Sequence, residues 1–256
     1  MTDNDELVSV SLSGGKDSTA MLLMMLERGE RIDEVVTVDT GMEFPEMYEH
    51  LEKLQQFTGL KFKTLRAERS FEHFMFDHVR TKGKFKGEAG YGWPRPNARW
   101  CTSNLKTAVI KKHLTTIGNG KHVTQCIGIA ADEPRRVREH RYPLVEYGVT
   151  EREALAYCKR LGFDWGGLYD TRNRVSCWCC PLQNLDSLRA LRRTHPELWE
   201  RLIEMDDKSF NSFRFSKTRC GEVKEISVRD LEDRFAKEDS DRYAYRKGLL
   251  YKMGKR

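Results

Sequence analysis

The hexapeptide Ser-Gly-Gly-Lys-Asp-Ser at residues 13–18 stands between two apolar segments and leaves few folds open to the chain. Residues 7–12 alternate apolar residues with serines, which predicts a buried strand. Residues 18–28 are rich in Ala, Leu and Met and are followed by Gly29, which predicts a helix that ends at a glycine. A strand, a glycine turn and a helix in this order are typical of an α/β fold built on a parallel sheet.

The alternation of strands and helices continues along the chain and predicts the fold class. We expect strands at 34–38, 61–65 and 123–129, and helices at 45–57 and 103–114. Right-handed crossovers between such elements give an open, mostly parallel sheet sandwiched by helices. The sequence therefore predicts an α/β domain over residues 1–150 and a smaller helical region with a cysteine cluster over residues 151–256.

Other segments are predicted from local signals. Thr150 to Glu153 has the spacing of a capping box, which predicts a helix that reaches about Leu161. Residues 185–205 are expected to be helical with a break near Pro196. Residues 81–97 hold four glycines and two prolines, which predicts either a loop over the site or a surface insert. Asp206 and Asp207 are interpreted as charges on a helix surface.

The hexapeptide has the chemistry of a phosphate-binding loop. Its glycines let the backbone approach phosphate oxygens, and the following helix points its positive end at the anion. Lys16 adds a mobile charge, Ser13 and Ser18 add hydroxyl donors, and Asp17 is a candidate metal ligand or helix cap. The Gly-x4-Gly-Lys spacing of the Walker A motif is absent. The alternative interpretation is a plain glycine turn that caps a helix.

The overall composition excludes a membrane protein and favours anionic partners. The chain has 256 residues, a net charge of +6 and no run of about 18 apolar residues that would span a membrane. The first ten residues are acidic and lack an apolar signal segment, so we expect a cytoplasmic protein. A positive excess suits nucleotides and also nucleic acid, although solvation of the surface explains it equally well.

Seven cysteines point to metal binding or redox chemistry. The count is odd and the protein is expected to be intracellular, so a disulfide framework is disfavoured. Cys177 and Cys180 form a Cys-x-x-Cys pair with Cys179 inside it, and such a pair can bind one metal or cluster. Cys126 and Cys158 fall in a predicted strand and helix and are expected to be small core residues.

Several motifs together resemble a known family. The hexapeptide resembles the PP-loop of ATP pyrophosphatases, and residues 38–48, Val-Asp-Thr-Gly-Met-Glu-Phe-Pro-Glu-Met-Tyr, resemble the second motif of phosphoadenylylsulfate (PAPS) reductases. Arg99-Trp100-Cys101-Thr102, with Leu105-Lys106 after it, resembles the cysteine–lysine segment of PAPS and adenylylsulfate (APS) reductases. Gly128-Ile129 and residues 132–136, Asp-Glu-Pro-Arg-Arg, resemble their Arg/Glu segment. The resemblance runs in order over roughly residues 7–183.

The resemblance implies an adenine nucleotide α-hydrolase-like fold and a set of site residues. The implied nucleotide-binding residues are Ser11, Ser13, Gly14, Gly15, Lys16, Asp17, Ser18, Asp39, Thr40, Gly41 and Gly128. The implied catalytic residues are Lys16, Asp17, Lys106, Arg135 and Arg136, with Mg²⁺ as a cofactor. Cations aimed at the leaving oxygens lower the barrier for splitting a phosphoanhydride.

The departures from the family pattern decide between substrates. The intact Gly-Gly-Lys-Asp loop favours ATP over PAPS or APS as the bound nucleotide. The Glu-Cys-Gly-Leu-His nucleophile motif of true PAPS reductases does not occur in the sequence, and Cys220-Gly221-Glu222 is a poor match to it. Direct reduction of PAPS by that route is therefore disfavoured.

For the cysteines, the resemblance implies an iron–sulfur site of the APS reductase kind. The implied metal ligands are Cys101, Cys177, Cys180 and a fourth residue, Cys220 or Cys179. A [4Fe-4S] cluster is the leading interpretation, and zinc or free thiols remain alternatives.

The sequence thus predicts an enzyme that binds ATP, cleaves it at the α-phosphate and adenylates an acceptor with release of pyrophosphate. The cysteine site would link this step to sulfur transfer or redox chemistry, with a thiol or electron donor protein as partner and a homodimer as a further expectation. The acceptor is not identified, and nucleic acid is one candidate. The alternatives are a PAPS or APS reductase that releases sulfite, and a nucleotide- or nucleic-acid-binding partner subunit with little catalysis.

Overall fold

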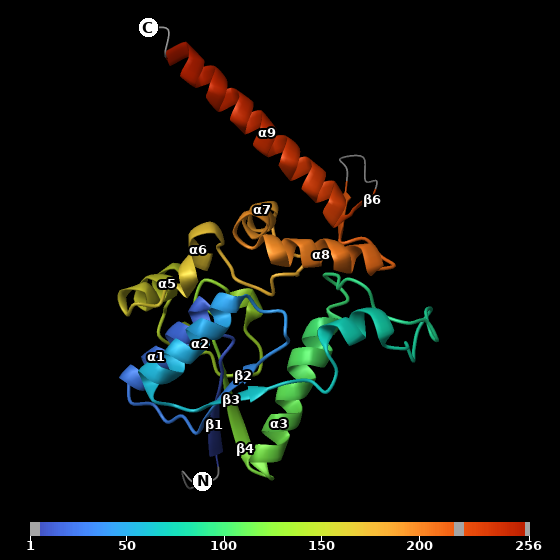
Figure 1. Ribbon diagram of the computed structural model, residues 1–256. Coiled ribbons are helices and arrows are strands. Elements are labelled where there is room, and N and C mark those ends of the chain that lie inside the picture. The colour runs from blue at the N-terminus through green and yellow to red at the C-terminus, as the bar shows by residue number, and fades with distance from the viewer. Residues whose placement is uncertain (1–5, 218–222, 254–256) are drawn as a thin grey trace. The chain divides into compact units, whose positions relative to one another are not determined.

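The computed structural model describes residues 6–217 and 223–253. The chain divides into two compact units (Figure 1). The first unit comprises Met1–His73 and Arg99–Trp178, and the second comprises Phe74–Ala98 and Cys179–Arg256. A segment from the middle of the chain therefore folds with the C-terminal part.

The first unit is built on a four-stranded parallel sheet in the order β3-β2-β1-β4. Its strands are β1 (Glu6–Ser11), β2 (Glu34–Val38), β3 (Phe62–Leu65) and β4 (His122–Ile127). Helices α1 (Lys16–Glu27) and α2 (Pro45–Thr58) lie on one side of the sheet, and α3 (Ala108–Gly118) lies on the other (Figure 1). This arrangement confirms the predicted open parallel sheet between helices, and it follows from right-handed crossovers.

The centre of this sheet is the apolar core of the unit. Val10 of β1 pairs in register with Val35 of β2 and with Cys126 of β4, and all three side chains are buried. Cys126 and Cys158 are fully buried, which confirms that they are core residues. Central strands that are covered on both faces bury most of their apolar surface, so they are rich in apolar residues.

Short helices complete the first unit. They are α4 (Pro143–Glu146), α5 (Glu151–Arg160) and α6 (Leu168–Thr171), with the 3-10 turns η3 (Pro134–Arg136) and η4 (Trp165–Gly167). The predicted capping box at α5 is present, because Thr150 accepts from the Glu153 backbone and the Glu153 side chain accepts in return. Helix α5 packs against α1, so the predicted boundary at residue 150 falls inside the first unit.

Two segments adopt the rare π-helix where the sequence predicted none. Residues Thr102–Thr107 form η2, so the helix expected at 103–114 is a π-turn followed by α3. Residues His73–Asp77 form η1. Periodicity does not distinguish a π-turn from the first turn of an α-helix, and such turns are frequent at functional sites.

The second unit consists of helices, a hairpin and the inserted segment. Its elements are α7 (Leu185–Thr194), α8 (Pro196–Lys208), β5 (Arg214–Lys217), β6 (Val223–Ile226) and α9 (Val228–Met253). The break at Pro196 lies where the sequence predicted it, because proline cannot continue the hydrogen bonding of α7. At the start of α9, Val228, Leu231 and Phe235 are buried and so attach this helix to the unit.

One buried carboxylate joins three parts of the second unit. Asp206 of α8 accepts a hydrogen bond of 2.8 Å from Trp93 Nε1 and one of 2.7 Å from the backbone N–H of Val228. The interpretation of Asp206 as a surface charge was therefore wrong, since this residue is only 9% exposed. Asp207 does pair with Arg229 at the surface. The helical pattern around Asp206 does not reveal that the indole N–H of Trp93, far away in the sequence, needs a hydrogen-bond acceptor.

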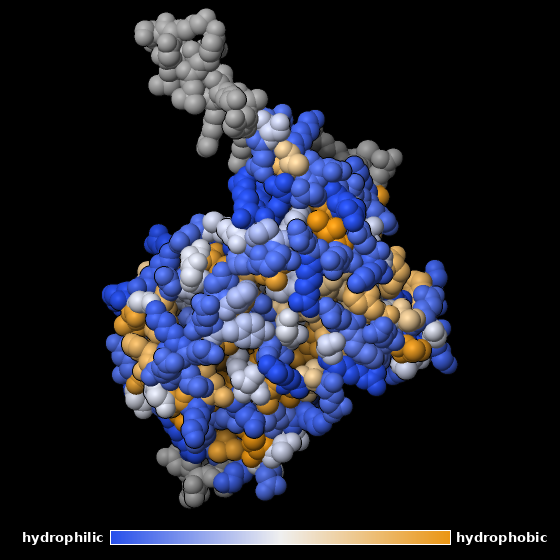
Figure 2. Space-filling model, viewed as in Figure 1, coloured by the Kyte–Doolittle hydropathy of each residue, from blue (hydrophilic) through white to orange (hydrophobic). Residues whose placement is uncertain are grey.

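No helix in the described residues is long and apolar enough to cross a membrane. On the face shown in Figure 2, hydrophilic surface predominates and hydrophobic surface is divided into separate patches. The six cysteines of the described residues are all free thiols.

We predict that Asp206→Ala lowers the free energy of unfolding by about 2–4 kcal/mol, because two buried donors lose their acceptor. Thermal and urea unfolding of the full chain measure the loss. Asp207→Ala is the matched control and should change stability by less than about 1 kcal/mol, since its ion pair is exposed. Equal losses for the two variants would contradict the role given to Asp206.

Candidate functional site

The predicted phosphate loop lies at the carboxyl end of β1, where the sheet order reverses. The connection from β1 to β2 runs through α1 on one face of the sheet, whereas the connection from β3 to β4 runs through α3 on the other face. Ligands of open α/β sheets bind at such a switch point. Gly128, which follows β4, lies directly against the start of α1. A Cβ atom on Gly128 would come within 2.6 Å of Ser18 Cα, so a larger residue would push the two segments apart.

Serine hydroxyls fix the loop from inside. The Oγ atoms of Ser13 and Ser18 are 3.0 Å apart, and the Ser13 N–H donates to Ser18 Oγ at 3.2 Å. Gly14 has a φ of +77°, and a Cβ there would come within 3.0 Å of Met47 Cε. This position therefore requires glycine for its backbone angle and for the close approach of α2. Ser11 is the last residue of β1 and leads into the loop.

Lys16 is not a mobile charge in this structure. Its Nζ lies 2.9 Å from Asp17 and 2.9 Å from Glu151, and the residue is only 4% exposed. The description of Lys16 as a mobile group on a surface loop is therefore corrected. The sequence could not reveal the partner Glu151, which is 135 residues away.

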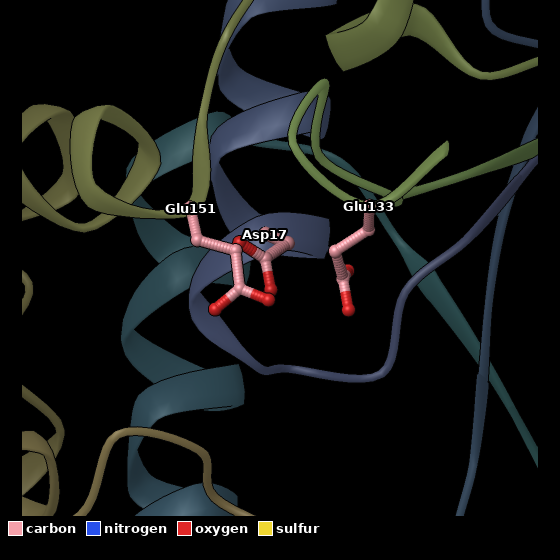
Figure 3. A group of neighbouring side chains, drawn as sticks. All are labelled: Asp17, Glu133 and Glu151. Atoms are coloured by element: carbon pink, nitrogen blue, oxygen red, sulfur yellow. The ribbon is translucent and has the colours of Figure 1, made fainter. Parts of the chain in front are cut away.

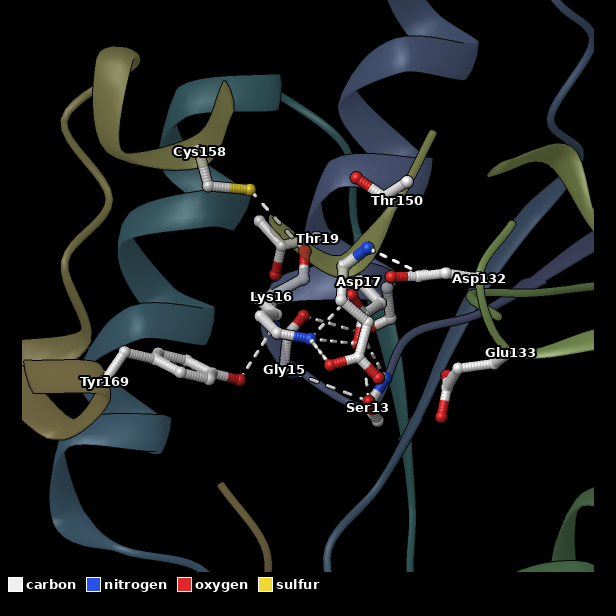
Figure 4. A network of polar contacts seen from close by, with 12 residues as sticks. Ser13, Gly15, Lys16, Asp17, Thr19, Asp132, Glu133, Thr150, Cys158 and Tyr169 are labelled. Carbon is white, nitrogen blue, oxygen red and sulfur yellow. Dashed lines mark hydrogen bonds and ion pairs between the residues drawn. The ribbon is translucent and has the colours of Figure 1, made fainter. Parts of the chain in front are cut away.

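Three aromatic side chains that sequence reasoning did not place at the site support the loop. Trp165 Nε1 donates to the Gly14 carbonyl at 2.7 Å. Tyr169 OH accepts from the Lys16 N–H at 2.9 Å (Figure 4). His50 stacks on Trp165 with ring centroids 4.5 Å apart. Trp165 has a φ of +53°, an unusual value for a bulky residue, and the indole hydrogen bond stabilises this conformation. Of these residues, Tyr169 has a sequence signal, because Leu168-Tyr169 resembles a further motif of PAPS reductases.

Three carboxylates form a cluster beside the loop. Asp17, Glu133 and Glu151 each offer an oxygen, and these oxygens lie within 4.8 Å of one another (Figure 3). Burial raises the pKa of Asp17, and the ion pair with Lys16 offsets this only in part. Lys16 and Arg136 pair with these three acids, so one negative charge remains in excess, which would favour a cation.

Asp132 and the arginines flank this cluster. Asp132 Oδ1 accepts from the Glu151 N–H at 3.0 Å and so caps α5 (Figure 4). Arg136 pairs with Glu133; burial alone would raise the pKa of Glu133, but this pair lowers it overall. Arg135 is exposed on the same 3-10 turn. Both arginines are thus on the loop after β4, close in sequence to Glu133.

A cavity of about 250 Å³ adjoins the loop on the side of β2 and β3. It is lined by apolar and polar side chains, among them Ser13, Asp39, Met47, Tyr48, Leu51, Gln55, Phe62 and Arg66. Asp39 accepts hydrogen bonds from Gly41 N, Tyr48 OH and Arg66 Nε at 2.7–2.9 Å. Burial would raise the pKa of Asp39, but these donors lower it overall, so the carboxylate is charged at neutral pH.

The loop after β2 brings the second motif and Lys106 together. Glu43 accepts from the N–H and the hydroxyl of Thr40, at 3.1 and 2.8 Å. Lys106, on the π-helix η2, lies 3.7 Å from Glu43. The predicted catalytic lysine therefore contacts the predicted nucleotide loop through a carboxylate. Lys106 and Arg135 keep partly or fully exposed side chains.

The predicted metal-binding cysteines are distributed over both units. Cys101 and Cys177 belong to the first unit, and Cys177 Sγ lies 4.0 Å from Glu43 Oε1. Cys180 belongs to the second unit, and Cys220 lies outside the described residues. Cys179 is 1% exposed, whereas Cys101, Cys177 and Cys180 are more accessible. The metal set, including the choice between Cys220 and Cys179 as its fourth member, stays a prediction.

Comparison with known proteins identifies the family. A model of the phosphoadenosine phosphosulfate reductase domain matches residues 7–183, and the chain belongs to this family. The match confirms the resemblance found in the motifs and covers the whole first unit from β1 onward together with the inserted segment. The class defined by fold and family match is thus an α/β protein of the PAPS reductase domain family.

Curated relatives are longer than this chain. Two uncharacterised proteins of Methanocaldococcus jannaschii are 27% identical over 207 residues and 25% identical over 227 residues, or 76% and 77% of this chain. An uncharacterised nin region protein of Escherichia phage lambda is 29% identical over 175 residues, or 60% of this chain. The matches span 40%, 47% and 60% of these relatives, so the chain covers about half of their length.

Among solved structures, the U34-tRNA thiolase NcsA of Methanococcus maripaludis, determined with its [4Fe-4S] cluster, is 18% identical to this chain. The superposition has a TM-score of 0.39 and covers 79% of this chain and 74% of that one.

We predict that His50 makes stability depend on acid pH. Burial, with a smaller effect of Lys53, lowers the pKa of His50 to about 4 from 6.5. The neutral ring is favoured in the folded state, so its contribution is complete above pH 6.5. As the pH falls toward 4, the unfolded chain binds the proton first and stability drops by up to about 3 kcal/mol.

Urea unfolding at pH 7, 6, 5 and 4 measures this effect. His50→Gln should remove that part of the pH dependence, whatever its own stability at pH 7. His140→Gln, at an exposed histidine, is the control and should keep the profile of the parent protein. An unchanged profile in His50→Gln would contradict the prediction.

Proposed function

We propose that the protein binds ATP and cleaves it at the α-phosphate, adenylating an acceptor and releasing pyrophosphate. The observation that carries the proposal is the intact loop at residues 13–18. It lies at the switch point of the sheet, with a helix N-terminus and a carboxylate cluster beside it. Membership in the PAPS reductase family supports an adenine nucleotide as the ligand.

The nucleoside would occupy the cavity beside the loop. Its volume of about 250 Å³ and its mixed lining suit a base and ribose. Apolar surface from Met47, Leu51 and Phe62 would pack on the base, and Gln55 offers a donor and an acceptor at its edge. The charged Asp39 would accept from a ribose hydroxyl. Ser13 lines both the cavity and the loop, so phosphates would extend from the ribose to residues 14–18.

The carboxylate cluster is suited to Mg²⁺. Mg²⁺ prefers oxygen ligands, and Asp17, Glu133 and Glu151 supply three oxygens within 4.8 Å of one another. When bound, the ion would neutralise charge on the phosphates and on the leaving pyrophosphate. Lys16 holds Asp17 and Glu151 in place from the buried side. A cluster without a cation would repel a triphosphate, so nucleotide and metal would bind together.

The reaction needs cations where negative charge develops. An acceptor nucleophile would attack the α-phosphorus, and the bond to the α,β-bridging oxygen would break. Pyrophosphate would leave with the electron pair, and the acceptor would lose its proton to water. Lys106 and Arg135 have accessible side chains and would stabilise the phosphate oxygens, and Arg136 would orient Glu133.

The products of ATP turnover test this proposal. We expect the full chain with ATP and Mg²⁺ to form AMP and pyrophosphate, with water as a slow acceptor, as measured by anion-exchange chromatography. ADP with phosphate would contradict cleavage at the α-phosphate. Release of sulfite from PAPS or APS with a thiol donor would favour the reductase alternative, and tight ATP binding without products would favour a binding subunit.

Glu133→Gln tests the metal site separately. Loss of one carboxylate should weaken Mn²⁺ binding, measured by electron paramagnetic resonance, by roughly tenfold or more. The same variant should need more Mg²⁺ for half-maximal AMP formation. Glu139→Gln, at an exposed glutamate six residues along the chain, is the control. Unchanged Mn²⁺ affinity in Glu133→Gln would exclude this residue as a ligand.

The cysteine set extends the proposal to sulfur or redox chemistry. Cys177 and Cys180 flank a turn and are both accessible, which suits a bound cluster better than a core role. We expect anaerobically purified protein to contain about four irons with sulfide. Cys177→Ser should lose most of this iron, whereas Cys126→Ser, at a buried core thiol, should keep it. Zinc without iron, or iron retained in Cys177→Ser, would contradict the assignment.

A further inference from the structure

The inserted segment forms a basic hairpin that the proposed function does not use. Val79 and Ala89 form an antiparallel bridge, and the Arg80 backbone bonds to Glu88 and Gly87 across the turn. The tip carries Lys82, Lys84 and Lys86 around Phe85, and all four side chains are exposed. Residues 79–98 hold five cationic side chains and one carboxylate. In the described part of the chain, none of the three lysines makes an ion pair.

Glycine contacts fix this hairpin to the second unit. A Cβ on Gly90 would come within 2.3 Å of the Met75 carbonyl, so the base of the hairpin packs closely on η1. Asn211 Oδ1 accepts from the Trp93 N–H at 2.7 Å, and Asn211 Nδ2 donates back to the Trp93 carbonyl. These contacts at Gly90 and Trp93 therefore fix the hairpin that carries the exposed lysines.

Exposed aromatic rings are paired with arginines on the same surface. The Arg80 guanidinium lies 5.0 Å from the Phe85 ring and 4.8 Å from the Phe210 ring. The Arg95 guanidinium lies 3.6 Å from the Phe215 ring. Phe85, Phe210 and Phe215 are 47%, 61% and 41% exposed, which is unusual for rings of this size.

Both arginines contact the short segment of residues 210–215. Arg80 lies on the ring of Phe210 at its start, and Arg95 lies on the ring of Phe215 at its end. Arg95 also donates to the Ser212 carbonyl at 3.2 Å. Between the two rings, Phe213 is buried and packs edge-on against Trp93. We name the set Arg80, Lys82, Lys84, Phe85, Lys86, Arg95, Phe210 and Phe215 the basic–aromatic surface.

We propose that the basic–aromatic surface binds single-stranded nucleic acid. Cationic side chains without carboxylate partners suit a phosphate backbone, and exposed rings suit unstacked bases. A duplex buries its base faces and could use only the lysines. A membrane would require the arginines that cover the rings to lose their hydration, which is costly. The inference goes beyond the proposed function, because it names a polymeric partner and needs no nucleotide turnover.

Binding of fluorescein-labelled 20-mers of oligo(dT) and oligo(rU), without ATP, tests the proposal. We expect the full chain to bind single strands more tightly than a 20-base-pair duplex in fluorescence anisotropy between 50 and 200 mM salt. Combined Lys82→Gln, Lys84→Gln and Lys86→Gln substitutions should weaken binding. They should also reduce the slope of log affinity against log salt by about 2, since each phosphate contact contributes about 0.7.

Phe85→Ala and Phe210→Ala should each weaken binding roughly tenfold without changing the salt slope, because stacking is not electrostatic. The matched controls are Phe57→Ala, at a ring 58% exposed on α2, and a triple Gln variant of the exposed lysines Lys61, Lys63 and Lys111. These controls should bind like the parent protein.

Three outcomes would overturn the proposal. They are no binding at 50 mM salt, equal binding of duplex and single strands with no effect of the phenylalanine variants, and preference for phosphatidylserine vesicles over oligonucleotides. Circular dichroism of each variant checks that the fold is retained. ATP and Mg²⁺ are absent from these assays, so failure here would leave the proposed nucleotide chemistry untouched.

Discussion

The site depends on the close contact between the start of α1 and the residue that follows β4. Gly128 has no side chain, so the backbone of β4 comes next to Ser18 and Asp17, and any Cβ would collide there. This contact sets where the loop of residues 13–18 faces relative to the loop that carries Glu133. Tyr169 and Trp165 then hold the loop backbone from the other side through hydrogen bonds to Lys16 and Gly14. A few backbone contacts thus assemble groups from distant parts of the chain.

The charges within this assembly are unevenly balanced. Lys16 is buried between Asp17 and Glu151, and removing a buried charge from its partners is costly, so these three groups act as one unit. Glu133 adds a third carboxylate, which Arg136 and, at longer range, Arg174 offset. The loop therefore combines a helix N-terminus, which attracts anions, with acids that attract cations. A metal–triphosphate complex satisfies both halves at once, whereas a free anion or a free cation satisfies only one.

Much of the first unit could be predicted from the sequence because local signals and the fold agree there. Strand and helix periodicity predicted the sheet and its helices. The glycines after α1 and α2 and the capping box at Thr150 marked helix ends, and all of these signals act within about ten residues. The loop itself was also predictable, because glycines and a strand–helix junction lie together in the sequence. The partners Glu151, Trp165 and His50 were not, since each reaches the loop from a separate element. Lys16 is buried because these elements pack around it, and the composition of the chain does not predict this burial.

The second unit combines residues from two separate parts of the chain, and one buried side chain explains why. Residues 74–98 lack periodicity, so the sequence offers only a loop, and their place is decided by Trp93. A buried indole needs an acceptor for its N–H, and Asp206 supplies one while also accepting from the start of α9. Satisfying these two donors binds the insert, α8 and α9 into one body. The exposed cations and rings of the insert are then carried by that body, whereas the cluster proposed to bind the nucleotide belongs to the first unit.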